Sequence, residues 1–172
     1  MPTNSLGLAL PDSGATEALG QALARAILGN GLGAGGVIHL RGELGSGKTT
    51  CARSLLHALG VTGTVRSPTY TLVDTYTLLN LTCVHVDLYR LRSSSEVEEL
   101  GLRDLTGPGY LMLIEWPEKG GAAVPAADLD LLLQYSGESR LGSLRAVSEL
   151  GVGWLTKLSL DNSLTPYVSN LT

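Results

Sequence analysis

Gly42-Glu43-Leu44-Gly45-Ser46-Gly47-Lys48-Thr49 is the stretch of sequence that decides the fold. It has the spacing G-x-x-x-x-G-K-[ST], in which glycines without a Cβ let the backbone wrap closely around an anion and turn several N–H groups toward it. A lysine and a hydroxyl residue at the end of such a loop suit a phosphate chain and its Mg²⁺ ion. The stretch therefore predicts a P-loop, the phosphate-binding loop of proteins that bind nucleoside triphosphates.

The segments on either side of the loop are those that a P-loop requires. Residues 37–40 form a short apolar run typical of a buried strand, and residues 48–59 carry apolar side chains at helical spacing before Gly60. A helix that starts directly after the loop adds its N-terminal N–H groups and its dipole to anion binding. Lys48 is then expected to reach the β- and γ-phosphates, and Thr49 to place its hydroxyl on Mg²⁺.

Two carboxylates follow apolar strands and are candidates for the metal side of the site. Asp87 follows the run Val84-His85-Val86, and Glu115 follows the run 111–114. Open α/β sheets bind ligands at the carboxyl ends of their strands, so both acids are expected at the same rim as the P-loop. Either could bind Mg²⁺, directly or through water, or orient the attacking water, and the residues alone do not separate these roles. An ordinary solvated strand-end acid is the alternative for each.

The rest of the pattern predicts an α/β fold, because strands alternate with helices along the chain. Besides the elements at the P-loop, we expect a helix over 16–28 and a short one over 96–100, with strands over 70–77, 81–87, 110–114, 129–135 and 144–147. These should build one P-loop NTPase domain over residues 13–149, with a central, mostly parallel sheet, helices on both faces and a β-hairpin at 70–87. Residues 1–12 are interpreted as an N-terminal lead-in. Residues 150–172 are interpreted as a C-terminal tail to which no structure is assigned.

Composition excludes several classes of protein. The 172 residues include only two cysteines, which argues against a disulfide framework, and no apolar run reaches the ~18 residues of a membrane span. The first residues lack the features of a secretory signal, so we expect a cytoplasmic protein with no membrane contact. The formal net charge of −4 argues against a free-standing nucleic-acid binder.

Other P-loop classes lack their own signatures in this chain. Neither Lys119 nor Lys157 is followed two residues later by aspartate, so the guanine-binding N/T-K-x-D element is absent and adenine is favoured. The L-S-G-G-Q signature of ABC-type ATPases is absent as well. A small-molecule kinase of the shikimate-kinase type remains the alternative function. It is disfavoured because residues 60–87 contain no D-x-D pair and residues 116–128 contain no arginine.

A second polar segment, Ser67-Pro68-Thr69-Tyr70-Thr71, precedes the strand expected at 70–77. Pro68 favours an extended conformation at Ser67, and the hydroxyls of Thr69 and Thr71 lie on the way into the strand. The segment could sense the γ-phosphate as a switch. From the residues alone a plain turn is the preferred interpretation.

Taken together, five blocks of the sequence resemble one family, the bacterial TsaE (YjeE) ATPases. The resemblance covers about residues 16–147, and its blocks are Gly42 to Thr50, Ser67 to Val73, His85-Val86-Asp87-Leu88-Tyr89-Arg90-Leu91, Glu99 to Leu102, and Ile114-Glu115-Trp116-Pro117-Glu118. Val86 stands where family members usually have phenylalanine, which a buried strand face should tolerate.

The resemblance implies an ATPase that uses ATP and Mg²⁺ to support threonylcarbamoyladenosine modification of tRNA. It implies TsaD-like and TsaB-like partner proteins, with tRNA contacted only indirectly through that complex. Lys48, Asp87 and Glu115 are implied as catalytic, and Thr49 and Glu115 as the metal side. Ser67, Thr69 and Thr71 become a switch segment, which replaces the plain turn. The implied nucleotide contacts are Glu43, Leu44, Gly45, Ser46, Gly47, Lys48, Thr49, Thr50 and Trp116.

Overall fold

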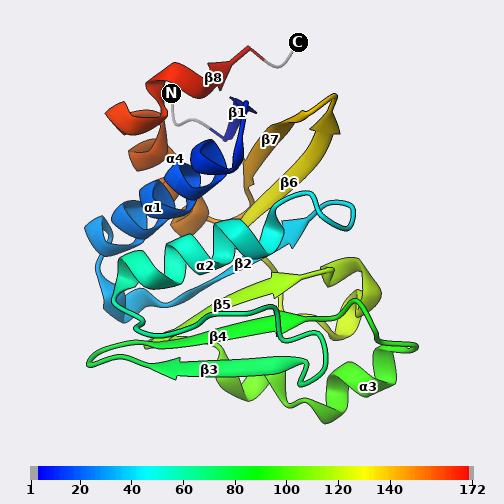
Figure 1. Cartoon of the computed structure of the whole chain (residues 1–172). Coiled ribbons are helices and arrows are strands. Elements are labelled where there is room, and N and C mark those ends of the chain that lie inside the picture. The colour runs from blue at the N-terminus through cyan, green and yellow to red at the C-terminus, as the bar shows by residue number, and fades with distance from the viewer. Residues whose placement is uncertain (1–3, 171–172) are drawn as a thin grey trace.

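An eight-stranded sheet organises residues 4–170, which are the residues that the computed structural model describes (Figure 1). Our expectations for residues 1–3 and 171–172 lie outside the described residues. The strand order is β3-β4-β5-β2-β6-β7-β1-β8. The strands are β1 (Ser5–Leu10), β2 (Gly36–Arg41), β3 (Val73–Thr77), β4 (Thr82–Asp87), β5 (Tyr110–Glu115), β6 (Leu129–Ser136), β7 (Ser139–Ala146) and β8 (Val168–Ser169).

The centre of this sheet is parallel and its flanks are antiparallel. β4, β5, β2 and β6 pair in parallel, which confirms the α/β fold class. β3 pairs antiparallel with β4, as the predicted hairpin requires. On the other side β7, β1 and β8 continue the sheet in antiparallel pairs, so the whole sheet is mixed.

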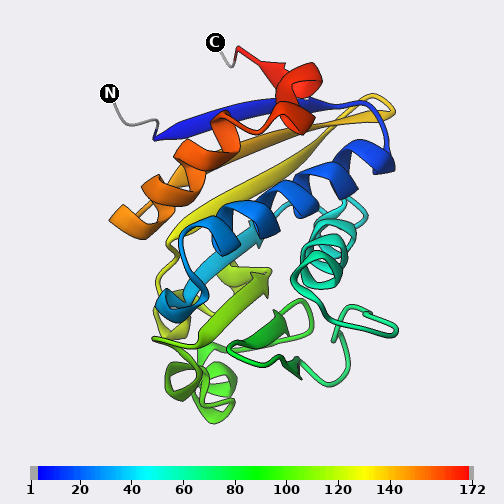
Figure 2. The same ribbon diagram turned by 90° about the vertical axis from the view of Figure 1, so that its left-hand side faces the viewer.

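Helices cover both faces of the sheet, as predicted (Figures 1 and 2). α1 (Ser13–Gly29), α2 (Lys48–Leu59) and α4 (Glu149–Ser159) pack on one face, where their apolar side chains join those of Cys83, Leu111 and Leu113 in one cluster. α3 (Ser94–Glu99) covers the other face together with short 3₁₀ turns, against Val84 and Met112. No helix among residues 4–170 is both long and apolar enough to cross a membrane.

Both ends of the chain carry structure that the sequence pattern did not assign. The lead-in contains β1, which pairs with β7 along its whole length. The tail contains α4, a 3₁₀ helix (Asn162–Tyr167) and β8. Trp154, Leu155, Leu158 and Leu164 from this tail are buried in the core. Both segments are therefore parts of the same α/β unit.

Several element boundaries differ from the predicted ones, and those of β3, β7 and α3 have clear local causes. β3 begins at Val73 rather than residue 70, because Leu72 takes a left-handed conformation (φ 68°) and its N–H donates to the carbonyl of Pro68 in a turn. β7 begins at Ser139 rather than residue 144, since it pairs with β6 up to the turn between them. α3 starts two residues early, after a cap at Ser93 whose N–H donates to the Glu96 carboxylate.

Candidate functional site

The P-loop joins β2 to α2 at the carboxyl edge of the parallel strands, and its glycines are needed for close packing. Gly42, Gly45 and Gly47 all have positive φ angles, the last as the residue before α2. A Cβ at Gly42 would collide with the carbonyl oxygen of Leu133 on β6 and lie 2.5 Å from the Ser46 hydroxyl oxygen. The loop is thus pressed against the sheet, and its backbone N–H groups remain available at the start of α2.

Lys48 lies inside the loop and is 5% exposed. The Nζ atom donates to the carbonyl oxygens of Gly42 at 2.7 Å and Glu43 at 2.9 Å. Burial lowers the pKa of Lys48 below its usual value, while the carboxylates of Glu115 and Asp87 act in the opposite direction. A largely desolvated cation at this place favours an anionic ligand such as a phosphate group.

Asp87 and Glu115 meet at the ends of neighbouring parallel strands. They are direct partners in the register of β4 and β5, so their side chains lie on the same face, the one that α2 covers. Asp87 is 4% and Glu115 2% exposed. Two buried carboxylates side by side repel each other and favour a cation between or beside them.

Glu115 is connected to the P-loop helix by a direct hydrogen bond. Its Oε1 accepts from the hydroxyl of Thr49 at 2.8 Å, and its Oε2 accepts from the ring Nε2 of His85 at 2.8 Å. The hydroxyl of Thr49 and the carboxylate of Glu115 therefore sit together as oxygen ligands of the kind that Mg²⁺ prefers.

Asp87 instead holds the segment of residues 67–72, which we call the switch segment. Its Oδ2 accepts from the hydroxyl of Ser67 and, at 3.3 Å, from that of Thr69, while its Oδ1 accepts from the N–H of Tyr89 at 2.9 Å. Thr71 points elsewhere, because its hydroxyl donates to Asp74. Of the three predicted switch residues, Ser67 and Thr69 reach the carboxylates and Thr71 does not.

Trp116 follows Glu115 and turns its ring over the P-loop lysine. Its backbone is left-handed (φ 59°), and the Lys48 ammonium lies 4.3 Å from the centre of its ring. The ring of Tyr89 packs beside it at a centroid distance of 5.0 Å. This contact places an aromatic wall next to the buried cation.

These side chains line one cleft of about 400 Å³, whose lining includes most of the predicted site residues. Glu43, Ser46 and Thr71 are the predicted residues outside this lining; the carbonyl of Glu43 holds Lys48 instead. The cleft is lined by Leu44, Gly45, Gly47, Lys48, Thr49, Thr50, Ser67, Thr69, Asp87, Tyr89, Arg90, Glu115 and Trp116. The sequence predicted no role for Tyr89 and Arg90, although both lie in the same block as Asp87, residues 85–91.

The hairpin of β6 and β7 contacts the P-loop on the side away from the carboxylates. These contacts were not predicted from the sequence. The hydroxyl of Tyr135 donates to the carbonyl of Leu44 at 2.6 Å, and Arg140 donates to the carbonyl of Gly45 at 3.3 Å. Arg140 also stacks on the Tyr135 ring at 4.0 Å. A smaller cavity of about 150 Å³ lies on this side, between the loop, the start of α1 and the hairpin.

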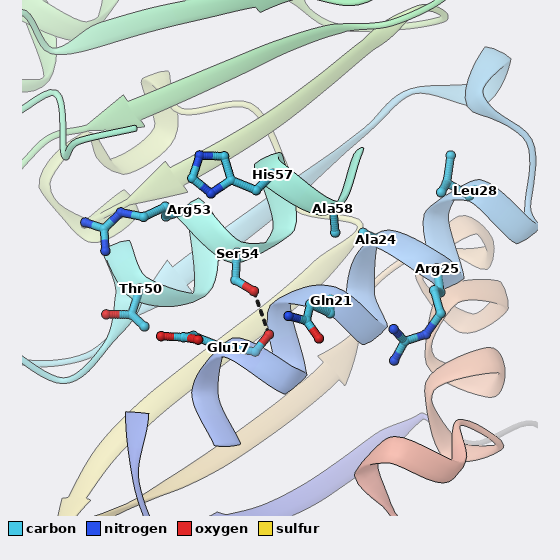
Figure 3. Close-up of a pocket in the computed structure, with 10 residues that line it drawn as sticks. All are labelled: Glu17, Gln21, Ala24, Arg25, Leu28, Thr50, Arg53, Ser54, His57 and Ala58. Carbon is cyan, nitrogen blue, oxygen red and sulfur yellow. Dashed lines mark hydrogen bonds between the residues drawn. The ribbon is translucent and has the colours of Figure 1, made fainter. Parts of the chain in front are cut away.

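A larger cavity, of about 540 Å³, lies apart from the carboxylates in the groove between α1 and α2 (Figure 3). Thr50 is the predicted site residue that lines it, and its other walls include Gln21, Arg25 and His57. The helices approach closely there, and the hydroxyl of Ser54 donates to the Glu17 carbonyl at 2.6 Å. Size alone does not identify a phosphate site. The cleft of about 400 Å³ is the candidate phosphate site, because it contains the buried lysine and both carboxylates.

The residues in the cleft fit a magnesium-bound nucleoside triphosphate. A glycine loop at a helix N-terminus and a buried ammonium suit the phosphates, and Thr49 with Glu115 suits Mg²⁺. The Ser46 hydroxyl is fully buried in the loop and has no hydrogen-bond partner among the described residues. Ser46 lines the cavity of about 150 Å³ on the other side of the loop rather than this cleft, so the fit rests on the lysine, the hydroxyl of Thr49 and the carboxylates.

Comparison with known proteins identifies the family. The family model described as "Threonylcarbamoyl adenosine biosynthesis protein TsaE" matches residues 10–142. The chain belongs to the TsaE family. The match spans the P-loop, both carboxylates and most of the β6–β7 hairpin, and the family's description places it in threonylcarbamoyladenosine biosynthesis.

Individual TsaE proteins show the same similarity. The chain is 40% identical over 123 residues to TsaE of Haemophilus influenzae, covering 72% of this chain and 78% of that protein. It is 34% identical over 104 residues to TsaE of Bacillus subtilis, covering 60% and 65%. The crystal structure of Bacillus subtilis YdiB superposes with a TM-score of 0.73 at 26% identity, over 91% of this chain and 95% of that one.

Proposed function

We propose that this chain binds and hydrolyses ATP with Mg²⁺ to support threonylcarbamoyladenosine modification of tRNA. The observation that carries the proposal is the hydrogen bond between Thr49 of the P-loop helix and Glu115 of β5. It unites the two halves of a metal-nucleotide site, one from the phosphate loop and one from a strand-end carboxylate. Membership of the TsaE family supports the biological context.

The residues divide the work as follows. Lys48 and the loop N–H groups bind the β- and γ-phosphates, while Thr49 and Glu115 hold Mg²⁺, which when bound supplies charge neutralisation at the transferred phosphoryl group. Asp87, bonded to Ser67 and Thr69, keeps the switch segment at the γ-phosphate side. Trp116 shields the lysine from water on the outer side.

The adenine base of ATP is assigned to the cavity of about 150 Å³ between the P-loop, the start of α1 and the β6–β7 hairpin. That cavity lies beside the loop and away from the carboxylates, and its walls include Asp12, Thr16 and Arg140. These side chains offer donors and acceptors to a base edge. Adenine is favoured over guanine because the chain lacks the N/T-K-x-D element.

The direct test compares ATP binding and hydrolysis in wild type and in Glu115→Gln. The amide keeps the shape of the carboxylate but removes its charge, so hydrolysis should fall at least about a hundredfold, while ATP binding in the presence of Mg²⁺ falls less, by at least about tenfold. Glu118→Gln is the matched control, because this nearby acid is 45% exposed and pairs with Arg41. Wild-type rates in Glu115→Gln would remove the carboxylate from the mechanism.

We further propose that hydrolysis is slow in the isolated chain and rises within a complex with TsaD-like and TsaB-like proteins. Exposed apolar side chains surround the cleft: Leu44 is 67%, Tyr70 83% and Tyr89 40% exposed. Arg90, which lines the cleft, stacks on Tyr70 at 4.3 Å, so a protein that covers Tyr70 would also contact the site.

The test is co-purification from the native host followed by ATPase assays with and without the co-eluting proteins. Stimulated hydrolysis and ATP-promoted assembly are expected. Because binding linkage is reciprocal, the partners should tighten ATP binding by the same factor as ATP tightens assembly. Efficient phosphorylation of a small metabolite by the isolated chain would favour the kinase alternative instead.

A further inference from the structure

His85 is a fully buried histidine directly behind the carboxylate pair. It lies on β4 two residues before Asp87, so both side chains face α2. Its partner in the register of β5 is Leu113, and its neighbours on that face belong to the apolar core. A polar ring at this depth needs a reason other than packing.

The ring makes one hydrogen bond, and that bond is to the candidate metal ligand. Nε2 lies 2.8 Å from Oε2 of Glu115. A carboxylate oxygen only accepts, so Nε2 carries the hydrogen and donates it. The other ring nitrogen, Nδ1, is buried without a hydrogen-bond partner among residues 4–170. The structure thus tolerates an unsatisfied nitrogen while keeping the donor to Glu115.

Glu115 is consequently held at both of its carboxylate oxygens. The Thr49 hydroxyl on α2 occupies Oε1 at 2.8 Å, and the His85 ring on β4 occupies Oε2. Ser67 is a weaker third neighbour, with its hydroxyl 3.5 Å from Oε2. A carboxylate with both oxygens fixed by rigid elements keeps one orientation, whereas one held at a single oxygen can rotate away.

We propose that His85 is a positioning residue that orients the Glu115 carboxylate for the Mg²⁺ ion bound with the nucleotide. The inference rests on the proposed function and deepens it, because it assigns a role to a residue that does not itself reach the nucleotide. It requires no change in the charge of the ring. Its specific content is that the Nε2–H donor, rather than the volume of the ring, is what the site uses.

Three substitutions separate the donor from the ring. In His85→Gln the amide nitrogen can take the place of Nε2, whereas in His85→Asn the shorter side chain reaches only the place of Nδ1. His85→Leu fills the space without any donor. His57→Leu is the control for loss of a histidine, since that ring is exposed on α2 and bonds the carbonyl of Gly63.

Calorimetric titration with ATP, once with Mg²⁺ and once with EDTA, is the measurement. We expect His85→Asn and His85→Leu to weaken ATP binding about tenfold or more with Mg²⁺ and to leave it unchanged with EDTA. His85→Gln should stay within about threefold of wild type in both conditions. Thermal unfolding of the nucleotide-free variants sets an assay temperature at which each is folded. If His85→Leu does not fold, the comparison of His85→Gln with His85→Asn still decides.

These titrations distinguish a failure of the role proposed for His85 from a failure of the proposed Mg²⁺–ATP site. Equal losses of ATP affinity with Mg²⁺ and with EDTA would mean that His85 only supports the fold. Unchanged ATP affinity in His85→Asn would mean that the site does not use the Nε2–H donor. Either result overturns the inference about His85 and leaves the proposed function standing. If wild type binds ATP no better with Mg²⁺ than with EDTA, the proposed Mg²⁺ site fails, and the inference fails with it.

Discussion

Replacing Trp154 with alanine should show that the C-terminal helix is part of the core on which the P-loop strand rests. Trp154 on α4 is 1% exposed. Its ring lies directly against Gly36, the first residue of β2, where any Cβ would collide with it. β2 leads straight into the P-loop, so the substitution opens a cavity beneath the strand that carries the site.

The size of the effect follows from the buried area. A tryptophan buries about 200 Å², and at about 25 cal/mol per Å² this corresponds to roughly 5 kcal/mol. Part is retained by the alanine methyl and by relaxation, so we expect Trp154→Ala to lower the free energy of unfolding by about 4 kcal/mol. At about 2–4 °C per kcal/mol for a chain of this size, the unfolding temperature should fall by about 8–16 °C.

Urea and thermal unfolding measure this loss, and Leu160→Ala is the control. Leu160 follows the same helix but is 76% exposed, so its truncation should cost less than about 0.5 kcal/mol. ATP affinity, measured well below the unfolding temperature, should stay unchanged in both variants. The reasoning is refuted if Trp154→Ala loses less than about 1 kcal/mol, because the helix would then not be docked as the structure shows.

Four further substitutions test separate parts of the molecule. Lys48→Ala should weaken ATP binding by at least about tenfold in calorimetry, since each hydrogen bond from a charged donor contributes about 1.5–3 kcal/mol; unchanged affinity would sink the P-loop assignment. Thr69→Ala should reduce the factor by which partner proteins tighten ATP binding, and an equal factor in variant and wild type would exclude the switch role. Gly20→Ala should destabilise the fold, because the new Cβ would lie 2.5 Å from the backbone of α2, and unaltered urea unfolding would argue against that close approach. The hydrogen bond from Arg25 lowers the pKa of Asp161 from 3.8 to about 2, so the pair stabilises the fold above the unfolded pKa, and the contribution is lost as the pH falls from about 4 through about 2. Asp161→Asn should therefore cost less than about 1 kcal/mol at pH 7, since Arg25 is 50% exposed, and the difference should shrink toward zero only as the pH falls below about 2, as acid titration of both proteins would show.

Features that depend on only a few neighbouring residues, such as the ends of a helix or the end of a strand, could be predicted from the sequence. Helix α2 spans the predicted residues because Gly47 and Gly60, at its two ends, both take left-handed conformations that glycine supplies. The strand-end position of Glu115 also followed from the apolar run before it. Such features depend on the local chain and need no knowledge of which strands are neighbours.

The C-terminal helix was missed for a physical reason that its glycines reveal. Leu150, Trp154 and Leu158 repeat at helical spacing, but Gly151 and Gly153 lie between them and lower the helix propensity of the segment. In the structure these glycines allow close contact: a Cβ at Gly151 would collide with the carbonyl of Asp128, and one at Gly153 would lie 2.5 Å from Asn30. Packing against distant segments overrode the local preference.

The contacts that complete the site were hidden because they depend on strand order. His85 meets Glu115 only because β4 and β5 are neighbours in a particular register, and Tyr135 meets the P-loop only because β6 lies beside β2. Sequence spacing places a residue on a strand and a face, whereas the neighbouring strand is set by the whole topology. The carboxylates were predictable as candidates, and their hydrogen-bonding partners were not.

The central place of β2 has a consequence for how such a protein can diversify. Its two neighbours in the sheet come from separate stretches of chain, β5 from the half that carries both acids and β6 from the half that forms the hairpin. Recognition of the base would thus draw on Arg140 of the β6–β7 hairpin together with the start of α1, whereas cleavage of the phosphate chain would draw on the strand ends of β4 and β5. Mutations in the β6–β7 hairpin could therefore retune the choice of nucleotide while the hydrolytic machinery stays intact.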